Sequence, residues 1–249
     1  MSPNKKLNTS LIINGKFSRY IGNRHKQQNI KMKYFLRITA ITLMIIGSLK
    51  VDAQRKITEG TISYDIVINT GKADPQMADM FDGATNVVYI KGTQSRSEMV
   101  SSLGTQATII DGKTGNVTVL KEYGDQKYMI PMTPGEWKQS NKKYEGITFT
   151  MVNEFKTIAG YNSQKAIGKM ADGTEFTVYF TREIVPENTD FQYANRGLPG
   201  LVMEYETAMG NLKVTYTVSN VNFNPVPAAK FDLPKSGFRI LSYKESTGK

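Results

Sequence analysis

Apolar and polar residues alternate along much of the chain after residue 54, which is the pattern of β-strands with one buried face. In residues 61–69, Ile62, Tyr64 and Ile66 share one face, and Ser63 lies on the other. The same alternation predicts four clear strands and several weaker ones. The clear strands are 61–69, 174–182, 201–207 and 212–219, and the weaker ones are 85–92, 106–111, 116–121, 126–131, 147–156 and 163–170.

Glycine-containing turns join these strands, and helical patterns are few. Short turns between neighbouring strands predict antiparallel pairing. Residues 73–81 are predicted to form a helix, because Met77, Met80 and Phe81 recur at helical spacing. Residues 187–195 favour either a short helix or an irregular loop.

The predicted fold class is mainly β, with about eight to eleven strands in one antiparallel sheet and one or two short helices. A sheet with one apolar face must bury that face, and the chain has too few predicted helical residues to cover the face of a flat sheet of this size. We therefore expect the sheet to curve strongly into a half-barrel around its helices, which can leave a cavity.

The first 53 residues have the features of an export signal. Met32 begins a basic stretch that is followed by an apolar run of about 12 residues, shorter than the roughly 20 that span a bilayer. We predict a signal peptide at 32–53 with cleavage after Ala53, and an uncleaved anchor is the alternative. Residues 1–31 are expected to be an upstream extension of the reading frame or a disordered tail. Residues 54–249 are predicted to be a single domain in the periplasm or secreted.

The basic charge of the chain lies in this leader. The chain has 32 Lys and Arg residues against 22 Asp and Glu residues, a net charge of +10. Residues 1–53 hold ten of the basic residues and one of the acids, which leaves 22 and 21 and a net charge of +1. A nucleic-acid partner is therefore not expected. No membrane span is expected after signal cleavage.

The residue types that are missing exclude several chemistries. The chain has no Cys, and its one His, His25, precedes residue 54. Ser-His-Asp and Cys nucleophile sites are therefore excluded, and zinc sites nearly always use His or Cys. We expect no enzyme activity, no metal and no cofactor. A hydrolase using carboxylates, Lys or Tyr stays open, since Glu204 and Glu206 share a strand face about 7 Å apart.

Methionine and aromatic residues are frequent in the predicted domain, which holds nine of the 12 Met residues. Met adapts to irregular shapes and is common at binding surfaces. One interpretation is an apolar pocket between the sheet and a helix, and an ordinary core is the alternative. The candidate ligand-binding residues are Met77, Met80, Phe81, Phe176, Phe180, Met203 and Tyr205.

A turn with two glycines precedes the predicted strand at 201–207. Its residues are Gly197, Leu198, Pro199, Gly200, Leu201 and Val202. Pro199 fixes its own φ and favours an extended Leu198, and the glycines permit positive φ on either side. This motif resembles the signature of the GLPGLI family of secreted, Bacteroidetes-type bacterial proteins. Residues 158–161 (Ile-Ala-Gly-Tyr) and 231–234 (Phe-Asp-Leu-Pro) are similar to two further elements of that family. The resemblance implies an envelope location and no assigned activity. By general shape, proteins of this family look like the half-barrels of periplasmic lipoprotein carriers, and fold alone does not fix function.

Besides that hydrolase, two functions from different classes remain after these exclusions. The first is a non-enzymatic envelope protein that binds an apolar ligand, such as a lipid or the acyl chain of a lipoprotein. The second is an interaction module that uses the sheet edges or the Trp137 region to dock an outer-membrane or secretion partner. An apolar cavity favours the first, and a solid core with an exposed apolar patch favours the second.

Overall fold

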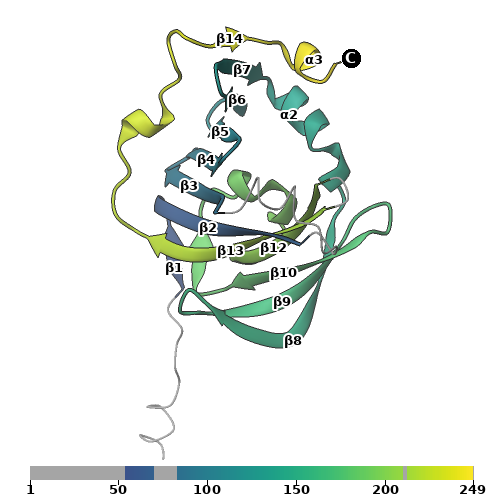
Figure 1. Cartoon of the computed structure of the whole chain (residues 1–249). Helices are drawn as coiled ribbons and strands as arrows, with labels where there is room; N and C mark the ends of the chain where they lie inside the picture. The colour runs from purple at the N-terminus through teal and green to yellow at the C-terminus, as the bar shows by residue number, and fades with distance from the viewer. Residues whose placement is uncertain (1–53, 70–82, 210–211, 249) are drawn as a thin grey trace, which may run out of the picture. The chain divides into compact units, whose positions relative to one another are not determined.

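The computed structural model describes residues 54–69, 83–209 and 212–248 (Figure 1). The predicted helix at 73–81 and the predicted signal peptide lie outside the described residues. The strands are β1 (Arg55–Ile57), β2 (Glu59–Asn69), β3 (Thr85–Lys91), β4 (Gln94–Ser101), β5 (Gly104–Asp111), β6 (Asn116–Tyr123), β7 (Gln126–Met132), β8 (Thr148–Ile158), β9 (Tyr161–Lys169), β10 (Glu175–Thr181), β11 (Ile184–Pro186), β12 (Leu201–Met209), β13 (Leu212–Asn222) and β14 (Arg239–Ile240). The helices are α2 (Pro134–Ser140) and α3 (Tyr243–Ser246), with 3-10 segments η2 (Lys142–Tyr144), η3 (Asp190–Asn195) and η4 (Ala228–Phe231).

One sheet of 12 strands organises the described part of the chain, in the order β14-β7-β6-β5-β4-β3-β2-β13-β12-β10-β9-β8. Every pair in it is antiparallel except β14 with β7. Strands β1 and β11 form a separate parallel pair. Because short turns join most sequential neighbours, the antiparallel pairing predicted from the sequence is confirmed.

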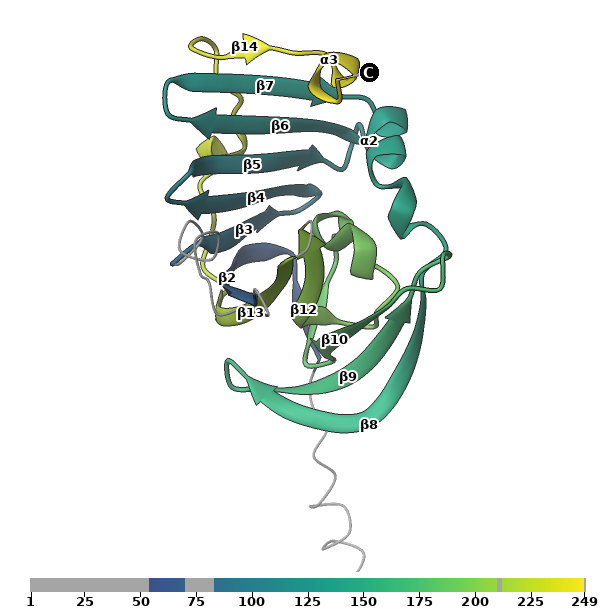
Figure 2. The ribbon, with the colours of Figure 1, turned by 45° about the vertical axis from the view of Figure 1, so that its right-hand side comes forward.

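The strand order requires two long connections, one from β7 to β8 and a later one from β13 back to β14 beside β7. The chain builds β2 to β7 outward in one direction, and β8 then begins the opposite edge. Residues 133–147, here called the crossover segment, connect the two edges and carry α2 and η2. Figure 2 shows α2 leaving the β7 side and the chain continuing toward β8. This topology places helical residues over one face of the sheet.

The buried side chains follow the predicted alternation. On β2, Ile62 is 0% exposed, Tyr64 3% and Ile66 8%. The largest cluster joins β2 and β3 to β10, β12 and β13, and it includes Met203 and Leu201. The core therefore sits at the middle of the sheet, where β2 meets β13.

The mainly β fold is confirmed, whereas a strongly curved half-barrel is not. The sheet is neither closed nor strongly curled, and β14 and β8 are its two separate edges. The physical reason is that the crossover segment and η3 pack against the apolar face of the sheet. The sheet therefore does not have to curl to bury that face. None of the helices in the described ranges has the length and apolar character to cross a bilayer.

Candidate functional site

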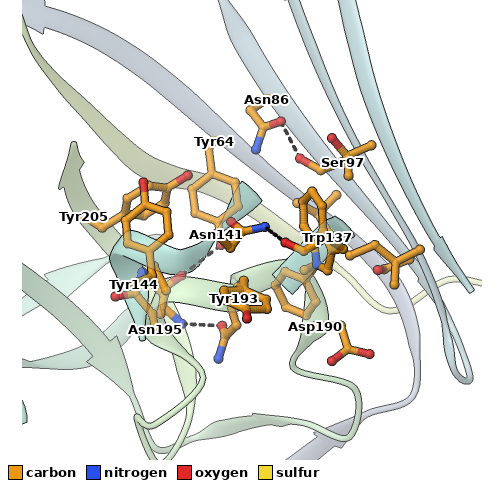
Figure 3. Close-up of a pocket in the computed structure, with 18 residues that line it drawn as sticks. Tyr64, Asn86, Ser97, Trp137, Asn141, Tyr144, Asp190, Tyr193, Asn195 and Tyr205 are labelled. Carbon is orange, nitrogen blue, oxygen red and sulfur yellow. Dashed lines mark hydrogen bonds between the residues drawn. The ribbon is translucent and has the colours of Figure 1, made fainter. Parts of the chain in front are cut away.

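A pocket of about 210 Å³ lies between the sheet face and the crossover segment, and we call it the crossover pocket. Its walls come from β2 to β5 and β12 on one side, and from α2, η2 and η3 on the other. Figure 3 shows labelled tyrosines, Trp137 and several side-chain amides around this space. The pocket is therefore a product of the chain crossing described above.

The sheet wall is polar at positions where a strand ordinarily buries apolar side chains. Asn86 on β3, Ser95 and Ser97 on β4, and Thr108 on β5 line the pocket. Asn86 and Ser95 are buried, and Ser97 Oγ donates a hydrogen bond of 2.9 Å to Asn86 Oδ1. These hydroxyl and amide groups can donate and accept hydrogen bonds on the sheet side of the pocket.

The crossover wall is built by a well-capped short helix. Thr133 accepts a hydrogen bond from the Glu136 backbone N–H, and the Glu136 carboxylate accepts one from the Thr133 backbone N–H. This capping box fixes the start of α2. Trp137, Asn141 and Tyr144 then recur at spacings of four and three residues, so they share one side of the segment and line the pocket.

Aromatic contacts connect this wall to η3. The Trp137 and Tyr193 rings meet edge to face, with centroids 6.1 Å apart. The Asn141 side chain donates a hydrogen bond of 3.0 Å to the Trp137 carbonyl oxygen. The Arg196 guanidinium lies over the Tyr193 ring, 4.3 Å from its centroid. The rings are thus held in place before any ligand arrives.

The third wall is η3, and the side chain of Gln192 fixes it to β12. Gln192 Nε2 donates to the Gly200 carbonyl oxygen, and the Val202 backbone N–H donates to Gln192 Oε1, each at 3.3 Å. The amide therefore pairs with the start of β12 as a neighbouring strand does. Because Gln192 is buried, these bonds satisfy backbone groups that would otherwise lack partners.

Two buried polar atoms in the pocket have no hydrogen-bond partner within the described residues. They are Ser95 Oγ, from the sheet wall, and Asn195 Oδ1, from η3. Ser95 is 1% exposed and Asn195 is 5% exposed. Buried polar atoms are nearly always paired, and an unpaired one costs about 1–3 kcal/mol. Both residues line the crossover pocket.

The phenols at the pocket stay uncharged at ordinary pH. Tyr64 donates a hydrogen bond of 3.0 Å to the Val202 carbonyl oxygen. Burial raises the pKa of Tyr64, and burial also raises the pKa of Tyr205 well above its usual value. Among the described residues that line the pocket, Asp190 alone carries a formal charge, and it is exposed at the rim. The interior of the pocket is therefore neutral.

The structure separates the candidate residues that the sequence grouped together. Tyr205 lines the crossover pocket, and its ring stacks on that of Tyr216 at 4.7 Å. Phe180 and Met203 are 0% exposed and pack in two different core clusters. Phe176 packs beside the Phe180 cluster. Met77, Met80 and Phe81 lie outside the described residues.

The Gly-Leu-Pro-Gly-Leu-Val motif is a turn that leads into β12, as predicted. The reason expected for its glycines is wrong, because neither Gly197 nor Gly200 has a positive φ. Gly200 is required by space instead: a Cβ there would lie 1.9 Å from the Thr181 carbonyl oxygen. Leu198 and Val202 are buried beside Phe180. The motif anchors η3, and through it one wall of the pocket.

The paired carboxylates on β12 are engaged in ion pairs. Lys156 Nζ lies 2.7 Å from Glu204 Oε1, and Lys213 Nζ lies 2.7 Å from Glu206 Oε1. Neither carboxylate lines the crossover pocket. Within the described ranges, no group of three or more Asp, Glu, His or Cys side chains comes together as a metal site does.

Sequence reasoning missed most of the pocket. The segment from Thr133 to Trp137 reads Thr-Pro-Gly-Glu-Trp, which is a capping box with Pro at the first helical position. That signal could have found α2. Asn195 and Ser95 carry no sequence signal, because their meaning comes from burial alone.

Comparison with known proteins gives no family. No protein-family model matches the chain, and no curated protein matches it. A structure of PNGF-II is similar at 14% identity and a TM-score of 0.44, covering 77% of this chain and 34% of that one. A crystal structure of MucB shares 13% identity at a TM-score of 0.36, covering 71% and 57%. A beta-barrel-like protein of domain of unknown function DUF1849 from Brucella abortus shares 8% identity at 0.33, covering 68% and 99%.

These likenesses are distant. The chain spans about one third of the PNGF-II structures it resembles, with 34% and 33% of their lengths covered. At such TM-scores the similarity carries no functional assignment.

Proposed function

We propose that this chain is a non-enzymatic protein of the bacterial cell envelope that binds a ligand in the crossover pocket. It is exported by its N-terminal signal, processed after Ala53, and belongs with the GLPGLI proteins. The observation that carries the proposal is the pair of buried, unpaired polar atoms, Ser95 Oγ and Asn195 Oδ1. A bound ligand supplies the missing partners, and ligand pockets characteristically combine aromatic walls with a few convergent polar groups.

The ligand occupies a small space. The pocket volume of about 210 Å³ is below the roughly 300–1,000 Å³ of drug-sized sites. The lipid form of the proposal requires an acyl chain in a half-barrel cavity lined by Phe176, Phe180 and Met203. These side chains pack against core neighbours, so the crossover pocket is the site we assign, and a lipid would enter it with a short group only.

Native mass spectrometry of the protein produced from the full chain, purified from a bacterial envelope, tests this function. We expect an added mass that disappears on solvent or acid extraction and that the extract then identifies. The matched variant is Asn195→Leu, which removes an acceptor with little change of volume and should lose the added mass. A clean protein mass, with no uptake from an envelope extract, contradicts ligand binding.

An interaction module is the second candidate, and one observation favours it. Within the described residues, strand β8 is an edge of the large sheet and pairs only with β9. On β8, Phe155 is 51% exposed and Met151 is 38% exposed. An exposed edge with apolar side chains can pair with another chain. Photo-crosslinking from position 155 in cells tests this: one specific envelope partner, lost on Phe155→Lys, supports docking, and diffuse or absent products contradict it.

A further inference from the structure

We propose that the ligand of the crossover pocket is a neutral, hydroxylated ring of the size of one sugar unit. This inference rests on the proposed function and adds the chemical class of the ligand. It is carried by three properties of the pocket: the kind of hydrogen bond that is missing, the absence of interior charge, and the volume.

The unpaired atoms specify what the ligand must offer. Asn195 Oδ1 is an amide oxygen and can only accept, so the ligand must present an O–H or N–H donor there. Ser95 Oγ can donate and accept, and a hydroxyl group satisfies it in either sense. The two atoms come from opposite walls, β4 and η3. A ligand with hydroxyls on two edges of a ring reaches both walls.

The charge of the pocket excludes several other classes. Its lining contains no Lys, Arg or His among the described residues, so a phosphate or carboxylate would be buried without a countercharge. A quaternary ammonium group suits aromatic rings, but it has no N–H to give to Asn195. Asp190 is exposed at the rim and lies outside the neutral interior. A neutral polar ligand meets these conditions.

The size of the pocket favours a single ring. A cavity of about 150 Å³ holds a benzene molecule, so about 210 Å³ accommodates a six-membered ring with several small substituents. Trp137 and Tyr193 provide apolar surface against which the C–H groups of such a ring can pack. Asn86 and Ser97 add amide and hydroxyl groups on the sheet side.

The experiment uses the protein produced from the full chain and follows Trp137, the one Trp of the sequence, by fluorescence. The neutral probes are methyl glucoside, methyl galactoside and N-acetylglucosamine. Glucose phosphate, glucuronate, choline and phosphatidylethanolamine vesicles represent the other classes. In parallel, the ligand extracted from envelope-purified protein is analysed for carbohydrate. Calorimetry confirms each binding signal.

We expect saturable binding of a neutral sugar, or carbohydrate in the extract. Ser95→Ala and Asn195→Leu should each weaken Kd about tenfold, the effect of one lost hydrogen bond. Ser163→Ala is the control, because Ser163 is equally buried but lies outside the pocket and donates to the Tyr161 carbonyl oxygen. It should leave Kd unchanged.

Three results would overturn the inference, and they separate it from the broader function. Ser95-dependent binding of a charged probe or vesicle, or a non-carbohydrate extract, refutes the sugar class and keeps the binding function. Sugar binding that Ser95→Ala and Asn195→Leu leave unchanged refutes the site. An empty extract with no binding of any probe refutes both, and ordered water is then the only partner of the two atoms.

Discussion

Replacing Ser95 by Ala should stabilise the ligand-free protein. The Ser95 hydroxyl is 1% exposed and has no partner among the described residues. Folding therefore removes its hydrogen bonds to water without replacing them. Ala keeps the Cβ and removes the oxygen, so the penalty is removed while little packing is lost.

The magnitude follows from the cost of an unpaired buried hydroxyl, about 1–3 kcal/mol. We take the lower end, because the open side of the pocket admits water. The free energy of unfolding should rise by about 1 kcal/mol, and Tm by about 2–4 °C for a domain of this size. Ser163→Ala should do the opposite. Its hydroxyl is 0% exposed and donates a bond of 3.2 Å to the Tyr161 carbonyl oxygen, so its loss costs about 1 kcal/mol.

Urea unfolding of the two variants and the parent, followed by the fluorescence of Trp137, measures this contrast. The slopes should agree, so that a shift in midpoint reports stability alone. The opposite signs of the two serine substitutions are the decisive result. If Ser95→Ala lowers the midpoint as Ser163→Ala does, the Ser95 hydroxyl has a hydrogen-bond partner in the free protein. That result would refute the claim that this hydroxyl is buried without a partner.

Other positions give measurable predictions. Ala159 has φ 49 in the two-residue turn between β8 and β9, a left-handed conformation that strains Ala. Asn tolerates this conformation better, so Ala159→Asn should raise the free energy of unfolding measured in urea by about 1 kcal/mol. An unchanged free energy of unfolding would contradict the strain. Gly200→Ala should cost about 3 kcal/mol or more against the Thr181 carbonyl, whereas Gly135→Ala, whose Cβ meets no atom closer than 4.0 Å, should not destabilise. Burial raises the pKa of Tyr64, so the folded protein keeps the phenol proton that the unfolded chain loses from about pH 10. The stabilising contribution of this phenol should therefore be complete below pH 10 and decrease above it. A urea midpoint that stays constant to about pH 11 would refute this.

The regular strands could be predicted because their buried faces are apolar. Alternation at 61–69 identified β2, where Ile62 and Tyr64 are indeed buried. The same signal failed for β4, which reads Gln-Ser-Arg-Ser-Glu-Met-Val-Ser. Its inward positions include Ser95 and Ser97, so neither face shows an apolar period. That strand was missed because its inner face lines the pocket.

The glycine motif shows a second limit of local reasoning. The sequence placed the turn before β12 correctly, since Pro and Gly act on their own backbone. It could not place Thr181 beside Gly200, because that approach depends on the pairing of β10 with β12. The same long-range packing determines which of the candidate ligand residues lie in the core and which line the pocket. Phe180 and Met203 became core, and Tyr205 reached the pocket.

Polar positions on a buried sheet face are themselves informative. Asn86, Ser95 and Thr108 each occupy a position where an apolar side chain would stabilise the sheet. Each of them lies opposite the crossover segment. A sequence that keeps one fold tends to satisfy every local preference, and departures concentrate where function requires them. Here the departures occupy three adjacent strands and face one pocket. A structural role alone would favour filling that space with apolar side chains, so the polar lining supports the ligand site that we propose.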